Sequence, residues 1–160
     1  MTPISGDTNE KGSFKKAFGD LVRYFGRRFT MVMYDAGATC LPNADAVIAA
    51  GKHYFFQVAD PRWVMFQTID LLFRDKSPSV RDEEVVSSNK RVVRELTILP
   101  VIQTAKNLTL WKHAKAIVKV YSETFTDGVL TGTKTRYFIT SMETSRLMAM
   151  QWLRLVILLL

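Results

Sequence analysis

The clearest pattern in the chain is an apolar run at residues 29–34 that ends at Asp35. Gly26 precedes the run and Ala36-Gly37 follows it, as expected for a buried strand that leads into a sharp turn. Open α/β sheets carry their functional groups at the carboxyl ends of central strands. The run therefore predicts a core strand that presents the Asp35 carboxylate at its end.

A helical period precedes this strand. Apolar residues recur three or four positions apart on one face: Phe14, Phe18, Leu21 and Phe25. This spacing predicts a helix over residues 13–25 that ends at Gly26. Residues 1–12 are rich in types that disfavour regular structure, so we expect them to form a flexible lead-in.

A second helix and a second strand follow. Pro42-Asn43 is typical of a helix start and Gly51 of a helix end, which predicts a short helix over residues 44–50. Residues 53–59 are mainly aromatic and apolar, and predict another buried strand. A strand, a helix and a strand in so short a segment predict a parallel pair joined by a crossover.

The remainder of the chain is predicted to be rich in strands. Apolar spacing indicates a helix from Pro61 to residue 74, and the polar residues 75–89 predict a loop. Three stretches mix β-branched and charged residues: 91–101, 114–125 and 133–141. Asp127-Gly128 is a turn signal that predicts a hairpin between the last two. Residues 145–160 predict a final helix.

Composition narrows the class of protein. A chain of 160 residues that is 48% hydrophobic and 23% charged is typical of one globular domain. Its net charge of +7 favours polyanionic partners such as nucleic acid. Cys40 is the only cysteine, which excludes an intrachain disulfide and a cysteine zinc cluster and fits a cytoplasmic location.

No membrane segment is predicted. Residues 1–12 lack the apolar core of a signal peptide. The apolar C-terminal run is interrupted by Arg154 and is much shorter than the ~20 residues that a membrane span requires.

Asp35 and Asp60 are the candidate site residues. Asp60 closely follows the second predicted strand, and the carboxyl ends of parallel strands meet at one edge, so Asp60 is expected to lie near Asp35 and is a candidate to hold a metal ion there. The alternative is that Asp35 only starts the turn by bonding its own backbone. His53 is predicted to pack at a strand end, and His113 to lie on a basic surface.

Several segments resemble insertion-sequence DDE transposases, around the second catalytic aspartate of that family. They are YDAGAT at 34–39, Asn43-Ala44, Val47, GKHYFF at 51–56, TRYFITS at 135–141 and QWLRL at 151–155. The resemblance rests on their order and spacing and covers most of the chain.

This resemblance implies an α/β fold with a partial RNase H-like core at residues 13–74. It further implies a β-rich insertion at 75–133, then a return strand and C-terminal helix at 134–160. The family cleaves and joins DNA with two divalent ions held by three carboxylates. The resemblance thus implies that Asp35 is catalytic and helps to hold the metal, that Mg²⁺ is the cofactor and that DNA is the partner.

Only Asp35 matches a catalytic position of the family. Asp7 and Asp20 are not credible as the first acid, and Glu143 does not match the last. One carboxylate cannot hold two Mg²⁺ ions. We therefore expect a truncated transposase copy that is inactive by itself.

Two other hypotheses remain open. One is a non-catalytic DNA-binding or regulatory module that pairs with full-length transposase or with a second copy. Its surface would be built from basic residues around Trp111, provided that they share one face: Lys106, Lys112, Lys115, Lys119, Lys134 and Arg136. The other is a fragment without function that aggregates through an unpaired sheet edge.

Overall fold

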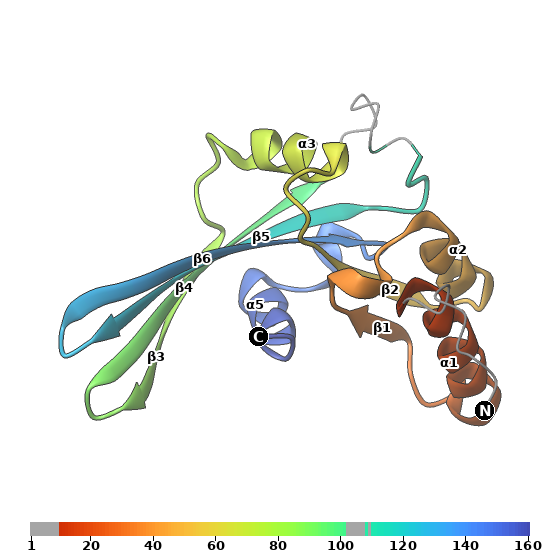
Figure 1. The fold of residues 1–160 in the computed structure, drawn as a ribbon, viewed down its shortest axis with the longest axis horizontal. Coiled ribbons are helices and arrows are strands. Elements are labelled where there is room, and N and C mark those ends of the chain that lie inside the picture. Colours follow the sequence, from red (N-terminus) through yellow and green to blue (C-terminus); the bar gives the residue numbers. More distant parts are fainter. Residues whose placement is uncertain (1–9, 102–107, 109) are drawn as a thin grey trace, which may run out of the picture.

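The computed structural model describes residues 10–101, 108 and 110–160. The strands of this part are β1 (Met31–Tyr34), β2 (His53–Val58), β3 (Val80–Ser87), β4 (Lys90–Pro100), β5 (Ala116–Thr126) and β6 (Val129–Thr140). They form one curled sheet in the order β1-β2-β6-β5-β4-β3 (Figure 1). β1 and β2 are parallel, and all other neighbours are antiparallel. The fold is therefore mixed α/β.

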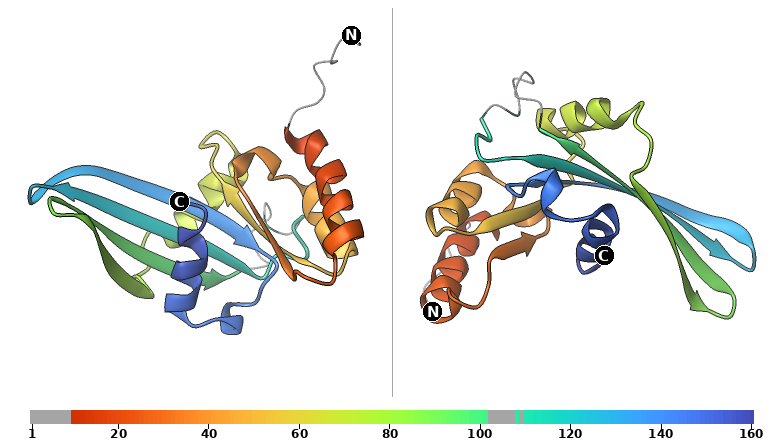
Figure 2. Two further views of the ribbon diagram at one scale, coloured as in Figure 1. Left: turned by 90° about the horizontal axis from the view of Figure 1, so that it is seen from below. Right: turned by 180° about the vertical axis from the view of Figure 1, so that it is seen from behind.

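Helices cover both faces of the sheet. The described residues form α1 (Glu10–Phe25), α2 (Leu41–Ala49), α3 (Val64–Phe73) and α5 (Ala149–Ile157), with short 3₁₀ turns η1 (Ala36–Ala38) and η2 (Thr144–Arg146). One face, here the α3 face, packs against α1, α2 and α3, and the opposite α5 face packs against α5 (Figures 1 and 2).

β2 is the most deeply buried strand because both of its faces are covered and both of its edges are paired. Tyr54 and Phe56 point to the α3 face, and Phe55 points to the α5 face. The ring centroid of Phe56 lies 5.7 Å from that of Phe14 in α1. The centroid of Phe55 lies 6.1 Å from that of Trp152 in α5. Alternation along one strand thus joins the two hydrophobic layers.

A polar contact fixes α3 over the sheet. The Tyr137 hydroxyl in β6 donates a hydrogen bond to the Asp70 carboxylate in α3. The Tyr137 ring stacks on Phe73 and meets Phe66 edge-on. Burial and then the Asp70 hydrogen bond and charge raise the pKa of Tyr137, so the phenol stays a neutral donor at physiological pH.

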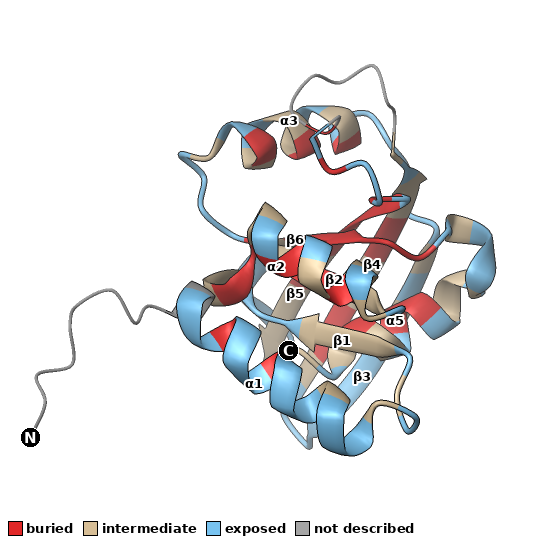
Figure 3. Ribbon diagram, turned by 90° about the vertical axis from the view of Figure 1, so that its right-hand side faces the viewer, coloured by how far each residue is buried: buried red, intermediate tan, exposed pale blue. Residues whose placement is uncertain are grey.

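The sheet extends beyond the helices as an arm, defined here as residues 80–95 and 119–136 (Figures 1 and 2). Figure 3 shows buried residues gathered near the helices, whereas the arm carries much exposed surface. At its tip the Asp127 N–H donates to the Asn89 carbonyl at 2.8 Å. The Arg91 guanidinium lies 4.1 Å from the Phe125 ring centroid. These contacts hold the two hairpins together.

Several predictions from the sequence are confirmed. The parallel pair of β1 and β2 is present, and so is the hairpin at Asp127-Gly128. The predicted strands at 91–101, 114–125 and 133–141 correspond to β4, β5 and β6. α1 begins at Glu10, three residues earlier than expected, and the rest of the predicted lead-in lies outside the described residues. α2 begins at Leu41, before its proline.

Two predictions are wrong. Residues 75–89 are not a loop throughout, because β3 occupies Val80–Ser87. β3 is an edge strand of the exposed arm and therefore lacks the apolar alternation of a half-buried strand. β1 is not a buried central strand, since it pairs only with β2 among the described strands and Tyr34 is 37% exposed. An apolar run in the sequence does not reveal whether the strand lies at the edge or in the centre of its sheet.

The C-terminal helix is shorter than predicted. α5 spans Ala149–Ile157 and follows η2. Its inner side carries Trp152, Leu153 and Val156, all fully buried, whereas Arg154 is exposed. The helix is thus amphipathic and packs one side on the sheet.

We expect Gly128→Ala to destabilise the fold by about 1 kcal/mol, because Gly128 has a φ of +78° that L side chains rarely adopt. Gly132→Ala is the matched control, since a Cβ at Gly132 meets no atom within 4 Å and needs no positive φ. Urea unfolding followed by circular dichroism measures both. Equal losses in the two variants would contradict the assignment of strain to the turn.

Candidate functional site

Asp35 lies where β1 ends, at the carboxyl edge of the parallel pair. Its Oδ1 accepts a hydrogen bond from the Gly37 N–H at 3.1 Å, and its backbone is extended before η1 begins. This geometry confirms that Asp35 starts the turn. The contact leaves the carboxylate on the surface, and the catalytic role of Asp35 stays a prediction.

Thr39 joins the ends of the two parallel strands. Its hydroxyl lies 2.6 Å from the Gln57 carbonyl of β2 and 3.3 Å from the Asp35 carbonyl. Thr39 is only 2% exposed, so water does not compete strongly for these acceptors. The Thr39 hydroxyl therefore links the C-terminal end of β1 to that of β2, next to Asp35.

Asp60 is held by a neighbour two positions along the chain. Its carboxylate accepts from the Arg62 backbone N–H at 3.0 Å, from Nε at 3.1 Å and from Nη2 at 3.2 Å. The hydrogen bond and the charge of Asp60 raise the pKa of Arg62. Because Arg62 neutralises it, the Asp60 carboxylate as arranged attracts a cation only weakly.

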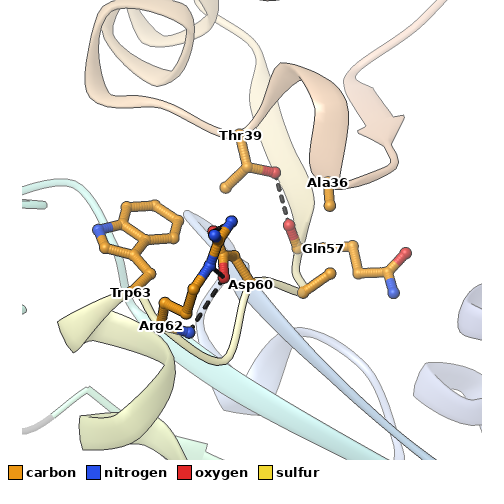
Figure 4. A pocket seen from close by; sticks show the side chains of 7 residues that line it. Ala36, Thr39, Gln57, Asp60, Arg62 and Trp63 are labelled. Carbon is orange, nitrogen blue, oxygen red and sulfur yellow. Dashed lines mark hydrogen bonds and ion pairs between the residues drawn. The ribbon is translucent and has the colours of Figure 1, made fainter.

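A cavity of about 630 Å³ lies next to this edge of the sheet. It is lined by Ala36, Thr39, Gln57, Ala59, Asp60, Arg62 and Trp63. Figure 4 shows the Asp60–Arg62 pair and the Trp63 ring together on one side, with Thr39 and Ala36 across from them. Asp60 lines this cavity, whereas Asp35 does not and instead accepts a hydrogen bond from Gly37.

The structure places both predicted acids at the expected edge, but it does not build a metal centre from them. Within residues 10–101, 108 and 110–160, no group of three His, Cys, Asp or Glu side chains could hold a metal ion. The two-ion chemistry requires three carboxylates. The described residues do not fit that site, and the expected Mg²⁺ and the metal role of Asp60 stay predictions.

Sequence reasoning did not single out Arg62, Trp63 or Thr39 as site residues. The sequence does contain a signal for Arg62. A basic residue two positions after Asp60, in a turn directly after a strand, is well placed to form an ion pair with that acid. Trp63 falls within the segment from Pro61 to residue 74, for which apolar spacing predicts only a helix. The role of Thr39 depends on the Gln57 carbonyl of β2 lying beside it, and the residues around Thr39 in the sequence do not reveal that contact.

The two histidines behave as predicted. His53 Nδ1 lies 3.1 Å from the Ser141 hydroxyl, which also accepts the Tyr54 N–H at 3.0 Å. These bonds tie the start of β2 to the residue after β6. His113 is exposed.

The predicted basic surface does not share one face. Lys119 points to the α3 face, while Lys134 and Arg136 point to the α5 face. Lys112 and Lys115 precede β5. Trp111 is buried and meets the rings of Tyr54 and Trp63 at an angle, so its ring is not available to a ligand. Lys106 lies outside the described residues.

No protein-family model matches this sequence, and no curated protein matches it either. In the described part of the chain, no helix combines the length and the apolar character that crossing a membrane requires.

We expect Thr39→Val to destabilise the fold by about 1 kcal/mol, because valine keeps the shape but leaves the Gln57 carbonyl without its donor. Thr135→Val, at an exposed position in β6, is the control. Thermal melting of both variants tests this expectation. If Thr39→Val melts like the control, the hydroxyl does not hold the strand ends together.

Proposed function

We propose that this chain is part of an insertion-sequence DDE transposase, with a partial RNase H-like core and a β-rich insertion, and that it is inactive by itself. One observation carries the proposal. β1, α2 and β2 form a parallel unit that presents Asp35 at its carboxyl edge, which is the arrangement that the resemblance to the family implies.

The rest of the sheet supports the same proposal. β3 to β6 are all antiparallel and follow the parallel unit along the chain, as a β-rich insertion would. β6 pairs with β2, so these strands continue the sheet of the proposed core. The other edge of β1 carries no strand among the described residues, and further strands of an RNase H-like sheet would pair there.

The proposed lack of activity follows from the number of acids. Strand cleavage of this kind needs two ions that steady the attacking and the leaving oxygen. Asp35 alone has the position of a family acid, and its Oδ1 already accepts from Gly37. Asp60 is neutralised by Arg62. Without two more carboxylates, the edge would hold a divalent ion too weakly to order the reacting oxygens.

We expect the purified chain to leave supercoiled plasmid DNA intact in Mg²⁺ or Mn²⁺. Agarose gel electrophoresis measures conversion to the nicked form, and Asp35→Ala serves as the matched variant. Nicking that disappears in Asp35→Ala would contradict the proposed inactivity, because other acids would then complete the site. Nicking that persists in Asp35→Ala would indicate a contaminant or a different site.

A second candidate is a non-catalytic DNA-binding or regulatory module, which would act in the cytoplasm by pairing with full-length transposase or with itself. The net charge of +7 favours this function. It needs no metal and no third acid, so the neutralised Asp60 and the surface-facing Asp35 do not count against it.

This second candidate predicts DNA binding that weakens with salt and survives Asp35→Ala. The physical reason is that Lys and Arg release counterions from the phosphates, whereas Asp35 contributes nothing to that attraction. Fluorescence anisotropy with a labelled duplex at several salt concentrations measures it. A folded chain that fails to bind at low salt would exclude this candidate.

The DNA on either side of the reading frame discriminates between the two. A neighbouring stretch that encodes an aspartate-bearing strand, or a glutamate-bearing helix in another frame, supports the decayed transposase. Unrelated flanking genes favour the binding module.

A further inference from the structure

The two faces of the arm differ in charge. Four basic residues of the arm point to the α5 face: Lys90, Arg94, Lys134 and Arg136. Their direction follows from strand alternation, because Leu96 in β4 and Phe138 in β6 pack in the cluster around α5 and lie an even number of positions away.

Acidic residues are fewer on this face. Only Asp82 and Glu84 of the arm strands point to the α5 face, and both belong to the edge strand β3. The α3 face of the arm is balanced, with three basic and three acidic residues: Arg81, Arg91, Lys119, Glu83, Glu95 and Glu123. The excess positive charge of the arm is therefore confined to the α5 face.

The ion pairs of the arm increase the difference in charge between its two faces. On the α3 face they are Arg81–Glu95 at 3.8 Å and Arg91–Glu83 at 3.2 Å. On the α5 face Arg94 pairs with Glu84. None of the ion pairs found among the described residues involves Lys90, Lys134 or Arg136. Three cations on one face thus lack an acidic partner in that part of the chain.

The cations lie close to one another around a hydroxyl. Arg94, Ser122 and Lys134 stand directly opposite one another on three neighbouring strands. Since strands lie roughly 4.8 Å apart, the Cα atoms of Arg94 and Lys134 are about 10 Å apart. Burial and then the charge of Arg94 lower the pKa of Arg136, as expected when two cations share one face. An anionic ligand would relieve this repulsion.

The shape of the arm selects the ligand. The arm curves toward the side on which α5 lies, so the basic face is concave (Figures 1 and 2). A flat lipid surface does not fit a concave sheet, whereas a rod of regularly spaced phosphates does. Duplex DNA presents one negative charge per about 1.7 Å of its axis, enough for several cations to be neutralised at once.

We propose that the α5 face of the arm binds the phosphate backbone of duplex DNA through Lys90, Arg94, Lys134 and Arg136. Contacts of this kind position a duplex without reading its sequence. Glu84 competes with the phosphates for Arg94 and so weakens the interaction. The choice of DNA as the partner rests on the proposed function, but the surface requires no cleavage chemistry.

The first test compares two lysines that lie on opposite faces of neighbouring strands. Lys134→Gln is expected to weaken binding of a labelled duplex of arbitrary sequence about fivefold at low salt. It should also reduce the slope of log affinity against log salt by about 1. Lys119→Gln, on the α3 face, is expected to change neither. Fluorescence anisotropy measures binding, and circular dichroism verifies that both variants are folded.

The second test uses two consecutive glutamates of β3. Glu84→Gln releases Arg94 on the α5 face and is expected to strengthen duplex binding about threefold. Glu83→Gln releases Arg91 on the α3 face by the same change of charge and is expected to have little effect. The pair separates the proposed surface from a general effect of net charge.

The outcomes distinguish this inference from the proposed function. If the folded chain binds duplex DNA but the members of each pair behave alike, the surface is wrong while DNA remains the partner. If the folded chain does not bind at low salt, both the surface and the choice of partner are overturned. The plasmid assay and the flanking sequence test the transposase origin independently of either result.

Discussion

The structure depends on the two-sided burial of β2. Tyr54 and Phe56 face one layer of helices and Phe55 faces the other, while β1 and β6 occupy the two edges of the strand. The three rings at the centre of this strand fill apolar layers on both faces, and each neighbouring strand is fixed by its hydrogen bonds to β2. β1, the only parallel neighbour, is aligned with β2 through this pairing. The location of Asp35 is a direct consequence.

The arm is the opposite case. Its strands leave the cover of the helices over most of their length, so much of their surface meets water, and their stability comes largely from the ladder, from cross-strand pairs and from the contacts that join the hairpin tips. Polar and charged side chains are then allowed on both faces. Because the strand period is two, adjacent residues such as Glu83 and Glu84 point to opposite faces. A balanced sequence can in this way produce one neutral and one basic surface.

At the carboxyl edge of the parallel pair, the described residues do not gather into a metal centre. Asp60 is satisfied by Arg62, and Asp35 is engaged with its own turn. A carboxylate that already has a donor is a poor start for a two-ion site unless further acids approach it. The cavity next to this edge of the sheet is lined by the Arg62 guanidinium, the Trp63 indole and the Asp60 carboxylate, which is already paired with Arg62.

The sequence by itself determined the elements whose signals are local. Apolar spacing located α1 and α3, Gly51 the end of α2, and Asp127-Gly128 the hairpin turn, because these depend on neighbouring residues. Only the tertiary structure decided that β1 lies at an edge, that residues of a predicted loop form β3, and that Lys119 and Lys134 face opposite ways. These properties depend on which strands pair and in which register, and pairing partners lie far apart along the chain. Charge could be counted from the sequence, but its division between two faces required the sheet.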